Sequence, residues 1–224
     1  MRTQRLILIA AVVLAVGYVW LRGGFIGLHA GSQVAAANEV AQSGLQTATF
    51  AGGCFWCVEA DFDKVPGVVS TTSGYTGGRV ANPTYEQVSR GGTGHAEAVE
   101  IVFNPAVVTY DQLLDHFWRN VDPFMAHRQF CDVGDQYRPE IFVHSDAQRT
   151  MAETSRQRVQ QRFKQSIVVK VTGATAFYPA EAYHQNYVCR NPDQGYIQSV
   201  ALPKVEKVRE KFKDMIKPDA PAPR

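Results

Sequence analysis

The sequence contains little cysteine and almost no net charge for its length. Its 224 residues include four cysteines, and 23 Lys and Arg stand against 21 Asp and Glu, which leaves a formal net charge of +2. Four cysteines are too few for a disulfide scaffold of this size, and a single C-x-x-C motif cannot complete a zinc ribbon. No run of Lys or Arg is interleaved with aromatic residues, so nucleic-acid binding is not predicted. These absences favour reactive cysteines and a protein without a metal or other cofactor.

The composition is that of one folded domain with appendages. Hydrophobic residues make up 45% of the chain and charged residues 20%, which is ordinary for a compact domain. We expect this domain to span residues 47–217. The small and polar segment 29–46 is predicted to be a flexible linker, and the Pro- and Ala-rich residues 218–224 are predicted to form a disordered tail.

An uncharged stretch near the N-terminus predicts a membrane anchor. Two arginines precede Leu6–Leu21, which as a helix would be about 24 Å long, against about 30 Å for the core of a bilayer. Continuation through Arg22, whose side chain can snorkel, supplies the missing length. Residues 1–28 are therefore predicted to be a signal anchor in the inner membrane, with the domain exported to the periplasmic or extracytoplasmic side. The alternative is a signal peptide cleaved at Ala35–Ala37, which would give a secreted protein.

Short strands and helices alternate along the domain. The expected strands are Thr47–Phe50, Val68–Tyr75, Glu97–Phe103, Ile141–His144 and Ile167–Val171. The expected helices are Cys54–Asp63, one that begins at the capping box Thr109-x-x-Gln112, one from the box Ser145-x-x-Gln148 to Gln165, and a last one after Pro203. The mixture of hairpin-like and crossover connections favours the α+β class over a regular doubly wound sheet.

The stretch Cys54-Phe55-Trp56-Cys57 places two thiols one helical turn apart. A cysteine at the start of a helix faces free N–H groups and the positive end of the helix dipole, which favour the thiolate. Cys54 is therefore the predicted nucleophile. Cys57 lies one turn later on the same side, near enough to attack an oxidised Cys54 sulfur after modest local unwinding. Taken alone, the motif also fits a structural disulfide or one corner of a metal site.

Further short sequence motifs follow this one over most of the domain. In chain order they are GGCFWCVEADFDKVPGV, SGYTGG, NPTYEQV, GHAEAV, DPF with RQFCDVGDQYR, and AEAYHQNY. From Phe50 to Tyr187 they closely resemble the A class of peptide methionine sulfoxide reductases. The resemblance implies an α+β two-layer sandwich with a ferredoxin-like core, here preceded by the single N-terminal membrane-anchor helix. It also implies reduction of the S-epimer of methionine sulfoxide, both in proteins and as the free amino acid.

The resemblance also implies roles for individual residues. The first Cys of the G-C-F-W word is the family's nucleophile, which is Cys54, and the acid of G-H-A-E is Glu97. The Asp of D-V-G-x-Q-Y-R is Asp132. The tyrosines of N-P-T-Y and Q-Y-R are Tyr85 and Tyr137.

The chemistry of sulfoxide reduction calls for the same residue types. A sulfoxide sulfur is electrophilic only when its oxygen is protonated or strongly hydrogen-bonded, because the oxygen leaves as water or hydroxide. Glu97 can donate the proton if an apolar pocket raises its pKa toward neutrality. Tyr85 and Tyr137 can donate hydrogen bonds to the same oxygen. Phe55 and Trp56 suit an apolar cup that binds the S-methyl group of the substrate.

The sulfenic acid left on Cys54 needs a second thiol, and three remain in the chain. Cys57 is favoured as the resolving cysteine because it is one helical turn away. Cys189, just after the AEAYHQNY word, is the main alternative, whereas Cys131 is expected to be a packed free thiol. A thioredoxin-like dithiol would reduce the resulting disulfide. We expect a monomer that acts on oxidised proteins and methionine sulfoxide.

Two other interpretations of the cysteines remain at this level. A thioredoxin-like disulfide oxidoreductase shares the order strand, turn, C-x-x-C and helix, but neither a later cis-proline loop nor a continuing β-α-β pattern is evident. A zinc-binding interaction module would use all four cysteines. His184, within the AEAYHQNY word, is expected to be a packed, hydrogen-bonded histidine and not a catalyst.

Overall fold

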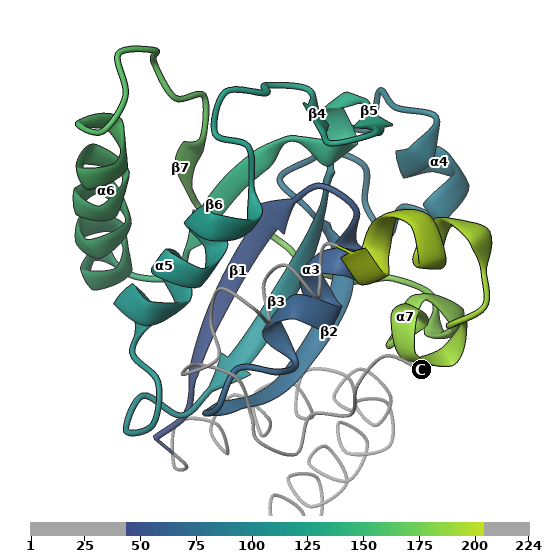
Figure 1. Ribbon diagram of the computed structural model, residues 1–224, viewed down its shortest axis with the longest axis horizontal. Helices are drawn as coiled ribbons and strands as arrows, with labels where there is room; N and C mark the ends of the chain where they lie inside the picture. Colours follow the sequence, from purple (N-terminus) through teal and green to yellow (C-terminus); the bar gives the residue numbers. More distant parts are fainter. Residues whose placement is uncertain (1–43, 204–224) are drawn as a thin grey trace, which may run out of the picture. The chain divides into compact units, whose positions relative to one another are not determined.

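The computed structural model describes residues 44–203, which form a mixed α+β domain around one main sheet (Figure 1). The sheet has six strands in the order β7-β6-β1-β3-β2-β8. Its strands are β1 (Gln46–Gly52), β2 (Val68–Thr76), β3 (Ala96–Phe103), β6 (Pro139–Val143), β7 (Lys170–Gly173) and β8 (Tyr178–Pro179). A separate hairpin is formed by β4 (Arg128–Gln129) and β5 (Asp132–Val133).

Helices connect these strands. They are α3 (Phe55–Phe62), α4 (Tyr85–Ser89), α5 (Tyr110–Asn120), α6 (Asp146–Gln160) and α7 (Tyr187–Arg190), with short turns η1 (Asp135–Tyr137), η2 (Ala182–His184) and η3 (Ile197–Ala201). The elements β1, α3, β2, β3, α5 and β6 follow one another with the spatial strand order β6-β1-β3-β2, and every neighbouring pair is antiparallel. This is the connectivity of a ferredoxin-like unit. The helix α6 then returns the chain so that β7 lies parallel to β6, as a crossover connection requires.

The main hydrophobic core lies between this sheet and the helices α3 and α5. Phe50 of β1 is at its centre, with its ring stacked 5.4 Å from Phe62 of α3 and 5.3 Å from Phe117 of α5. Because side chains alternate along a strand, the next residue, Ala51, faces the other side of the sheet. There it belongs to a smaller buried cluster with Ala98 and Phe142. Truncation of Phe50 to Ala is expected to cost about 3–5 kcal/mol of stability, the usual scale for a large core ring.

The capping box predicted at Thr109 is confirmed. The Thr109 side chain accepts from the Gln112 amide at 3.2 Å, and the Gln112 side chain accepts from the Thr109 amide at 2.8 Å. The box predicted at Ser145 is only half formed. Ser145 accepts from the Gln148 amide, but the Gln148 side chain accepts from His144 and donates to the Thr47 carbonyl. A long-range contact with β1 has therefore replaced the local one.

Two predicted boundaries are wrong for one shared reason. The helix α6 ends at Gln160 and not at Gln165, and the following strand covers Lys170–Gly173 and not Ile167–Val171. The Gln160 side chain donates to the carbonyls of two residues beyond the helix and accepts from the Ile167 amide, which folds the chain into a turn. The next amide, of Val168, donates to the carbonyl of Pro123, so this stretch pairs with a loop before it joins the sheet.

The predicted strands near Thr47, Val68, Glu97 and Ile141 are confirmed with small shifts of their ends. Gln46, predicted as the last linker residue, already pairs with Phe103 in the sheet. The predicted anchor at 1–28, nearly all of the predicted linker, the helix after Pro203 and the tail at 218–224 lie outside the described residues. Within 44–203, no helix has the length and apolar character needed to cross a membrane.

Candidate active site

The turn at the end of β1 places Cys54 at the start of α3. Gly53 has φ +95°, and a Cβ at this position would lie 2.6 Å from the Cβ of Gln129, so only glycine fits. The carbonyl of Cys54 then accepts from the amides of Cys57 at 3.1 Å and Val58 at 3.3 Å, which opens the helix. Cys54 is thus the N-cap residue, as the sequence predicted.

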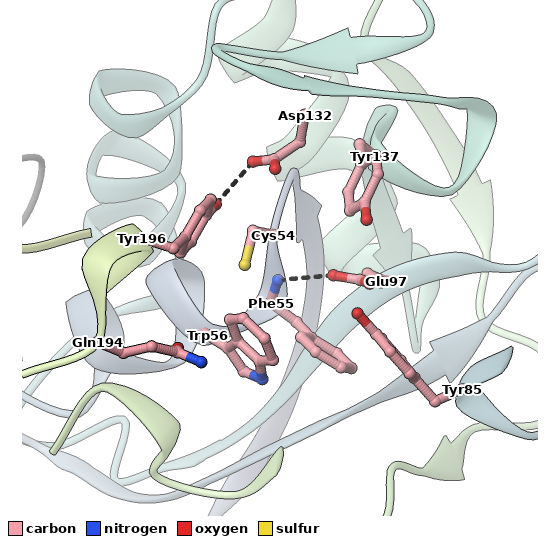
Figure 2. A pocket seen from close by; sticks show the side chains of 9 residues that line it. All are labelled: Cys54, Phe55, Trp56, Tyr85, Glu97, Asp132, Tyr137, Gln194 and Tyr196. Atoms are coloured by element: carbon pink, nitrogen blue, oxygen red, sulfur yellow. Dashed lines mark hydrogen bonds between the residues drawn. The ribbon is translucent and has the colours of Figure 1, made fainter. Parts of the chain in front are cut away.

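A cavity of about 270 Å³ opens beside Cys54 (Figure 2). Its walls come from α3, the start of α4, β3, the β4–β5 hairpin with η1, and the chain after α7. The lining residues are Cys54, Phe55, Trp56, Tyr85, Glu97, Asp132, Tyr137, Gln194 and Tyr196. Seven of these nine are the catalytic and substrate-binding candidates from the sequence, so residues distant along the chain meet at one place. Cys57, the remaining candidate, is buried in α3 and is not part of the lining.

Glu97 is a buried carboxyl group within the sheet. It is only 2% exposed, and its Oε2 accepts from the amide of Phe55 at 3.0 Å. Burial raises the pKa of Glu97 to about 8, although the Phe55 amide opposes the shift. The nearby Asp132 and Cys57 contribute to this rise of the Glu97 pKa. At neutral pH this side chain therefore carries a proton that it can donate into the cavity.

The expectation that the helix start would favour a Cys54 thiolate is wrong for the protein without substrate. Burial raises the pKa of Cys54 well above its ordinary value, and the hydrogen bond and charge of Cys57 add to the shift. Glu97 acts in the same direction, whereas a hydrogen bond with Tyr196 lowers the Cys54 pKa. Desolvation of the sulfur outweighs the end of an eight-residue helix, so the resting nucleophile is a thiol.

Two tyrosines face the Glu97 carboxyl. Figure 2 shows the phenol oxygens of Tyr85 and Tyr137 turned toward it from opposite sides. Burial raises the pKa of Tyr85 to about 12, and the charge of Glu97 adds to this. The pKa of Tyr137 is also raised by burial and by Glu97. Both phenols therefore remain protonated hydrogen-bond donors at any physiological pH.

Asp132 lies across the cavity from this group. It is the first residue of β5, and its Oδ2 accepts from the hydroxyl of Tyr196 at 2.8 Å. In Figure 2 the Cys54 sulfur lies between this pair and Glu97. Asp132 helps to keep Glu97 protonated, since its charge raises the Glu97 pKa.

The aromatic wall is held rigidly. Phe55 is 1% exposed, and the Trp56 ring stacks on Tyr187 with 3.8 Å between centroids and 8° between planes. The indole N–H of Trp56 donates to His184 Nδ1 at 3.0 Å. His184 is buried among these rings, which confirms the expectation of a packed, hydrogen-bonded histidine.

All four cysteines are free thiols in the structure. Cys57 is buried and hydrogen-bonded to Cys54. Cys189 is exposed on α7, where the charges of Asp63 and Lys64 act on it at the far end of α3. Cys131 is free, but the expectation that it would be packed is wrong, because it lies exposed in the turn of the β4–β5 hairpin. Within residues 44–203 no three Cys, His, Asp or Glu side chains are grouped so that they could hold a metal ion, so the zinc-module interpretation gains no support.

Two lining residues were missed in the sequence. Gln194 and Tyr196 lie in the irregular chain after α7, beyond the last recognised word. A single aromatic residue in such a segment belongs to no periodic pattern, and the only local signal was the neighbouring Gly195. Tyr196 nevertheless contacts both the nucleophile and Asp132 through hydrogen bonds.

A buried thiol that shares one small cavity with a protonated carboxyl group, two phenols and an aromatic wall defines a thiol-dependent oxidoreductase. The chain belongs to the peptide methionine sulfoxide reductase family, whose model matches residues 46–216. The family predicted from the sequence is thereby confirmed.

Relatives agree with this assignment. The chain is 46% identical over 174 residues to peptide methionine sulfoxide reductase MsrA 1 of Rhodopirellula baltica, covering 78% of this chain and 91% of that protein. It is 51% identical over 150 residues to the MsrA of Ligilactobacillus salivarius, covering 66% and 87%. Among solved structures, reduced Mxr1 of Saccharomyces cerevisiae has a TM-score of 0.63 at 31% identity, covering 68% of this chain and 88% of that one. Methionine sulfoxide reductase A of Corynebacterium diphtheriae has a TM-score of 0.60 at 33% identity, covering 66% and 76%.

Proposed function

We propose that this enzyme reduces the S-epimer of methionine sulfoxide, in proteins and as the free amino acid, through attack of Cys54 on the sulfoxide sulfur. The observation that carries the proposal is the buried Glu97, whose pKa of about 8 keeps a proton beside the nucleophile. A sulfoxide oxygen is a poor leaving group until it is protonated, and this acid is in position to supply that proton.

In the first step the sulfoxide oxygen takes the place facing Glu97, Tyr85 and Tyr137. Glu97 transfers its proton to this oxygen while the phenols donate hydrogen bonds to it. The Cys54 sulfur then attacks the substrate sulfur, and an S–S bond forms as the S–O bond breaks; the oxygen takes its second proton from the thiol and leaves as water. A water molecule attacks the Cys54 sulfur and breaks the S–S bond, which releases methionine and leaves a Cys54 sulfenic acid, and the proton set free returns to Glu97.

Three different contacts set the stereochemistry. The S-methyl group packs on Phe55 and Trp56, the oxygen faces Glu97, and the sulfur faces Cys54. Three non-equivalent contacts to one chiral sulfur admit one epimer only. The choice of the S-epimer follows the resemblance to the A class.

The second step resolves the sulfenic acid. Cys57 is the proposed resolving residue because it is hydrogen-bonded to Cys54 from the next turn of α3, whereas Cys189 lies toward the opposite end of that helix. The Cys57 thiol condenses with the sulfenic acid, which forms a disulfide and releases water. A thioredoxin-like dithiol then reduces the disulfide by exchange. The first turn of α3 must unwind locally, since disulfide geometry does not fit an intact helix.

The proposal is tested with each separated epimer of a methionine sulfoxide peptide and with dithiothreitol as reductant. Only the S-epimer should be converted, and Cys54→Ser should convert neither, because a serine hydroxyl is far too weak a nucleophile. Conversion of the R-epimer at a comparable rate would contradict the proposed arrangement. Insulin reduction in a parallel assay tests for the alternative activity of a thioredoxin-like disulfide oxidoreductase.

For its location, we propose an inner-membrane protein with the catalytic domain on the extracytoplasmic side. Support comes from the sequence of residues 1–28 alone, where an uncharged apolar run follows two arginines.

A further inference from the structure

The carboxyl group of Glu181 binds a residue of the cavity wall, Tyr85, without being part of the lining itself. Its Oε1 accepts from the amide of Tyr85 at 2.9 Å, and its Oε2 accepts from the hydroxyl of Tyr75 at 2.9 Å. Tyr75 is fully buried in β2, so this bond fixes the carboxylate to the sheet. Tyr85 is the first residue of α4, so the other bond fixes the start of that helix and the phenol it carries.

His184 connects the same carboxylate to the opposite side. Because His184 Nδ1 accepts from the Trp56 indole N–H at 3.0 Å, the neutral ring must carry its proton on Nε2. That nitrogen is buried, has no hydrogen-bond partner among the described residues, and lies 3.9 Å from Glu181 Oε2. A movement of about 1 Å would bring the two atoms to hydrogen-bond distance. The His184 ring also packs against Tyr85, with 4.3 Å between centroids.

We propose that Glu181 is a positioning residue that sets the separation between Trp56 and Tyr85, directly on the tyrosine side and through His184 on the tryptophan side. It touches neither the substrate nor Cys54. Trp56 belongs to α3 and Tyr85 to α4, and the ring of Phe55 in α3 already stacks on Tyr85 with 6.5 Å between centroids. Glu181 and His184 add a polar connection between the two walls, so the sulfoxide oxygen and the S-methyl group are received at a fixed distance from each other. This inference rests on the roles proposed above for Trp56 and Tyr85.

The charge on Glu181 suits this task. Burial alone would raise the pKa of Glu181, but hydrogen bonds from the Tyr85 amide, its own amide and the Tyr75 hydroxyl bring the pKa below its ordinary value. A carboxylate accepts from all of these donors, and its charge also attracts the Nε2–H of His184, 3.9 Å from Oε2. A glutamine has one acceptor oxygen, so its amide group would have to face a donor. Glu181→Gln therefore keeps the shape of the side chain and removes its ability to serve all its donors.

The test compares Glu181→Gln with a matched control, Glu86→Gln, which removes an exposed acid from the same helix α4. We expect kcat/KM for a methionine S-sulfoxide peptide to fall about 10-fold in Glu181→Gln, mainly through KM, the scale of one lost buried hydrogen bond. The indole proton resonance of Trp56, assigned by its loss in Trp56→Phe, should shift in Glu181→Gln and stay in place in Glu86→Gln. Unchanged kinetics, an unmoved Trp56 resonance, or an equal loss in Glu86→Gln would each overturn the proposal.

A second variant tests the route through His184. His184→Phe keeps a ring among the aromatic side chains but can neither accept from Trp56 nor face Glu181 with a donor. Its loss of kcat/KM should match that of Glu181→Gln, and the double variant should be no worse than either single one. Additive losses in the double variant would overturn the proposal. Unchanged kinetics of His184→Phe would also overturn it, and this result can be obtained even if Glu181→Gln does not fold. Tyr85→Phe and Trp56→Phe distinguish failure of this inference from failure of the proposed function. If both variants are slow while Glu181→Gln has normal kinetics, only the positioning role of Glu181 is refuted. If both variants have normal kinetics, the roles proposed for Tyr85 and Trp56 in the reaction are refuted.

Discussion

Replacement of Glu97 by glutamine would remove the proton that the reaction needs while keeping the shape of the side chain. The amide oxygen can take over the hydrogen bond from the Phe55 amide, now 3.0 Å from Glu97 Oε2, and the amide nitrogen then faces the cavity. The fold should therefore survive. We expect the reductive step to slow by about 10²-fold or more below pH 8, the usual scale for a lost positioned acid.

The pH dependence of this loss is the sharper prediction. In the wild-type enzyme the active form holds a protonated Glu97, whose pKa is about 8, beside the Cys54 thiol. In Glu97→Gln the titrating acid is gone, and Cys54 stays a thiol because burial raises its pKa well above the ordinary value, so the ratio of the two rates reports the protonation of Glu97. The ratio of wild-type to variant rate should be constant below pH 8 and should fall about tenfold per pH unit above it, because the wild-type acid is then lost.

The free energy of unfolding should also depend on pH through Glu97. The ordinary carboxyl pKa of 4.5 rises to about 8 on folding, so the folded protein holds a proton that the unfolded chain has released. The stabilisation is complete below pH 4.5 and is lost as the pH rises through 8. At about 1.4 kcal/mol per pH unit, Glu97 should reduce the free energy of unfolding by about 3 kcal/mol between pH 5 and pH 8. Glu97→Gln should lack this part of the loss.

Single-turnover release of methionine, measured by rapid quench from pH 6 to pH 9.5, checks the kinetics. Urea unfolding of both proteins at pH 5 and pH 8, with reductant present, checks the stability. A rate ratio that stays level across pH 8 would refute the assignment of Glu97 as the proton donor, and so would a variant that keeps a wild-type rate.

Three further outcomes are expected. Cys57→Ser should release one equivalent of methionine but lose turnover with a thioredoxin-type reductant, and peptide mapping of oxidised wild-type enzyme should find Cys54 joined to Cys57; normal turnover with a linkage to Cys189 would transfer the resolving role. Thr109→Ala should lower the free energy of unfolding by about 1 kcal/mol in urea titrations, since it removes a helix N-cap, with activity unaffected; no loss of stability would mean that the box at α5 contributes nothing. The full chain should pellet with membranes and be extracted by detergent, while a chain from residue 47 should be soluble and active; a mature N-terminus at Asn38 would establish cleavage instead.

The sequence predicts most of the sheet because its signals are local. Alternation of hydrophobic and polar residues, turn residues and a capping box predict the strands around Thr47, Val68 and Glu97 and the helix at Thr109. Each of these signals lies within a few residues. The end of α6 could not be predicted in this way. Gln160 stops that helix by binding the chain that follows, and no propensity of glutamine announces such a turn.

In the candidate site too, local sequence signals predict some features, while others depend on distant residues. The motifs around Cys54 and Glu97 predicted residues that line one cavity. Glu97 accepts a hydrogen bond from the amide of Phe55, the first residue of α3, although 42 positions separate the two residues. The state of the thiol could not be read from the helix start, because burial by distant segments decides it. The sequence predicted no role for Tyr196 or Glu181 for a related reason, since each is hydrogen-bonded to residues far away in the chain.

The outer edge of the sheet beside β2 limits how this protein can associate with extended chains. The strand β8 has two residues, and the second, Pro179, has no N–H group to offer. A foreign strand that approached β8, which pairs only with Gly74 and Tyr75 of β2, would find too few donors and acceptors there for a continuous ladder. Addition of an extended polypeptide to the β8 end of the sheet is therefore disfavoured.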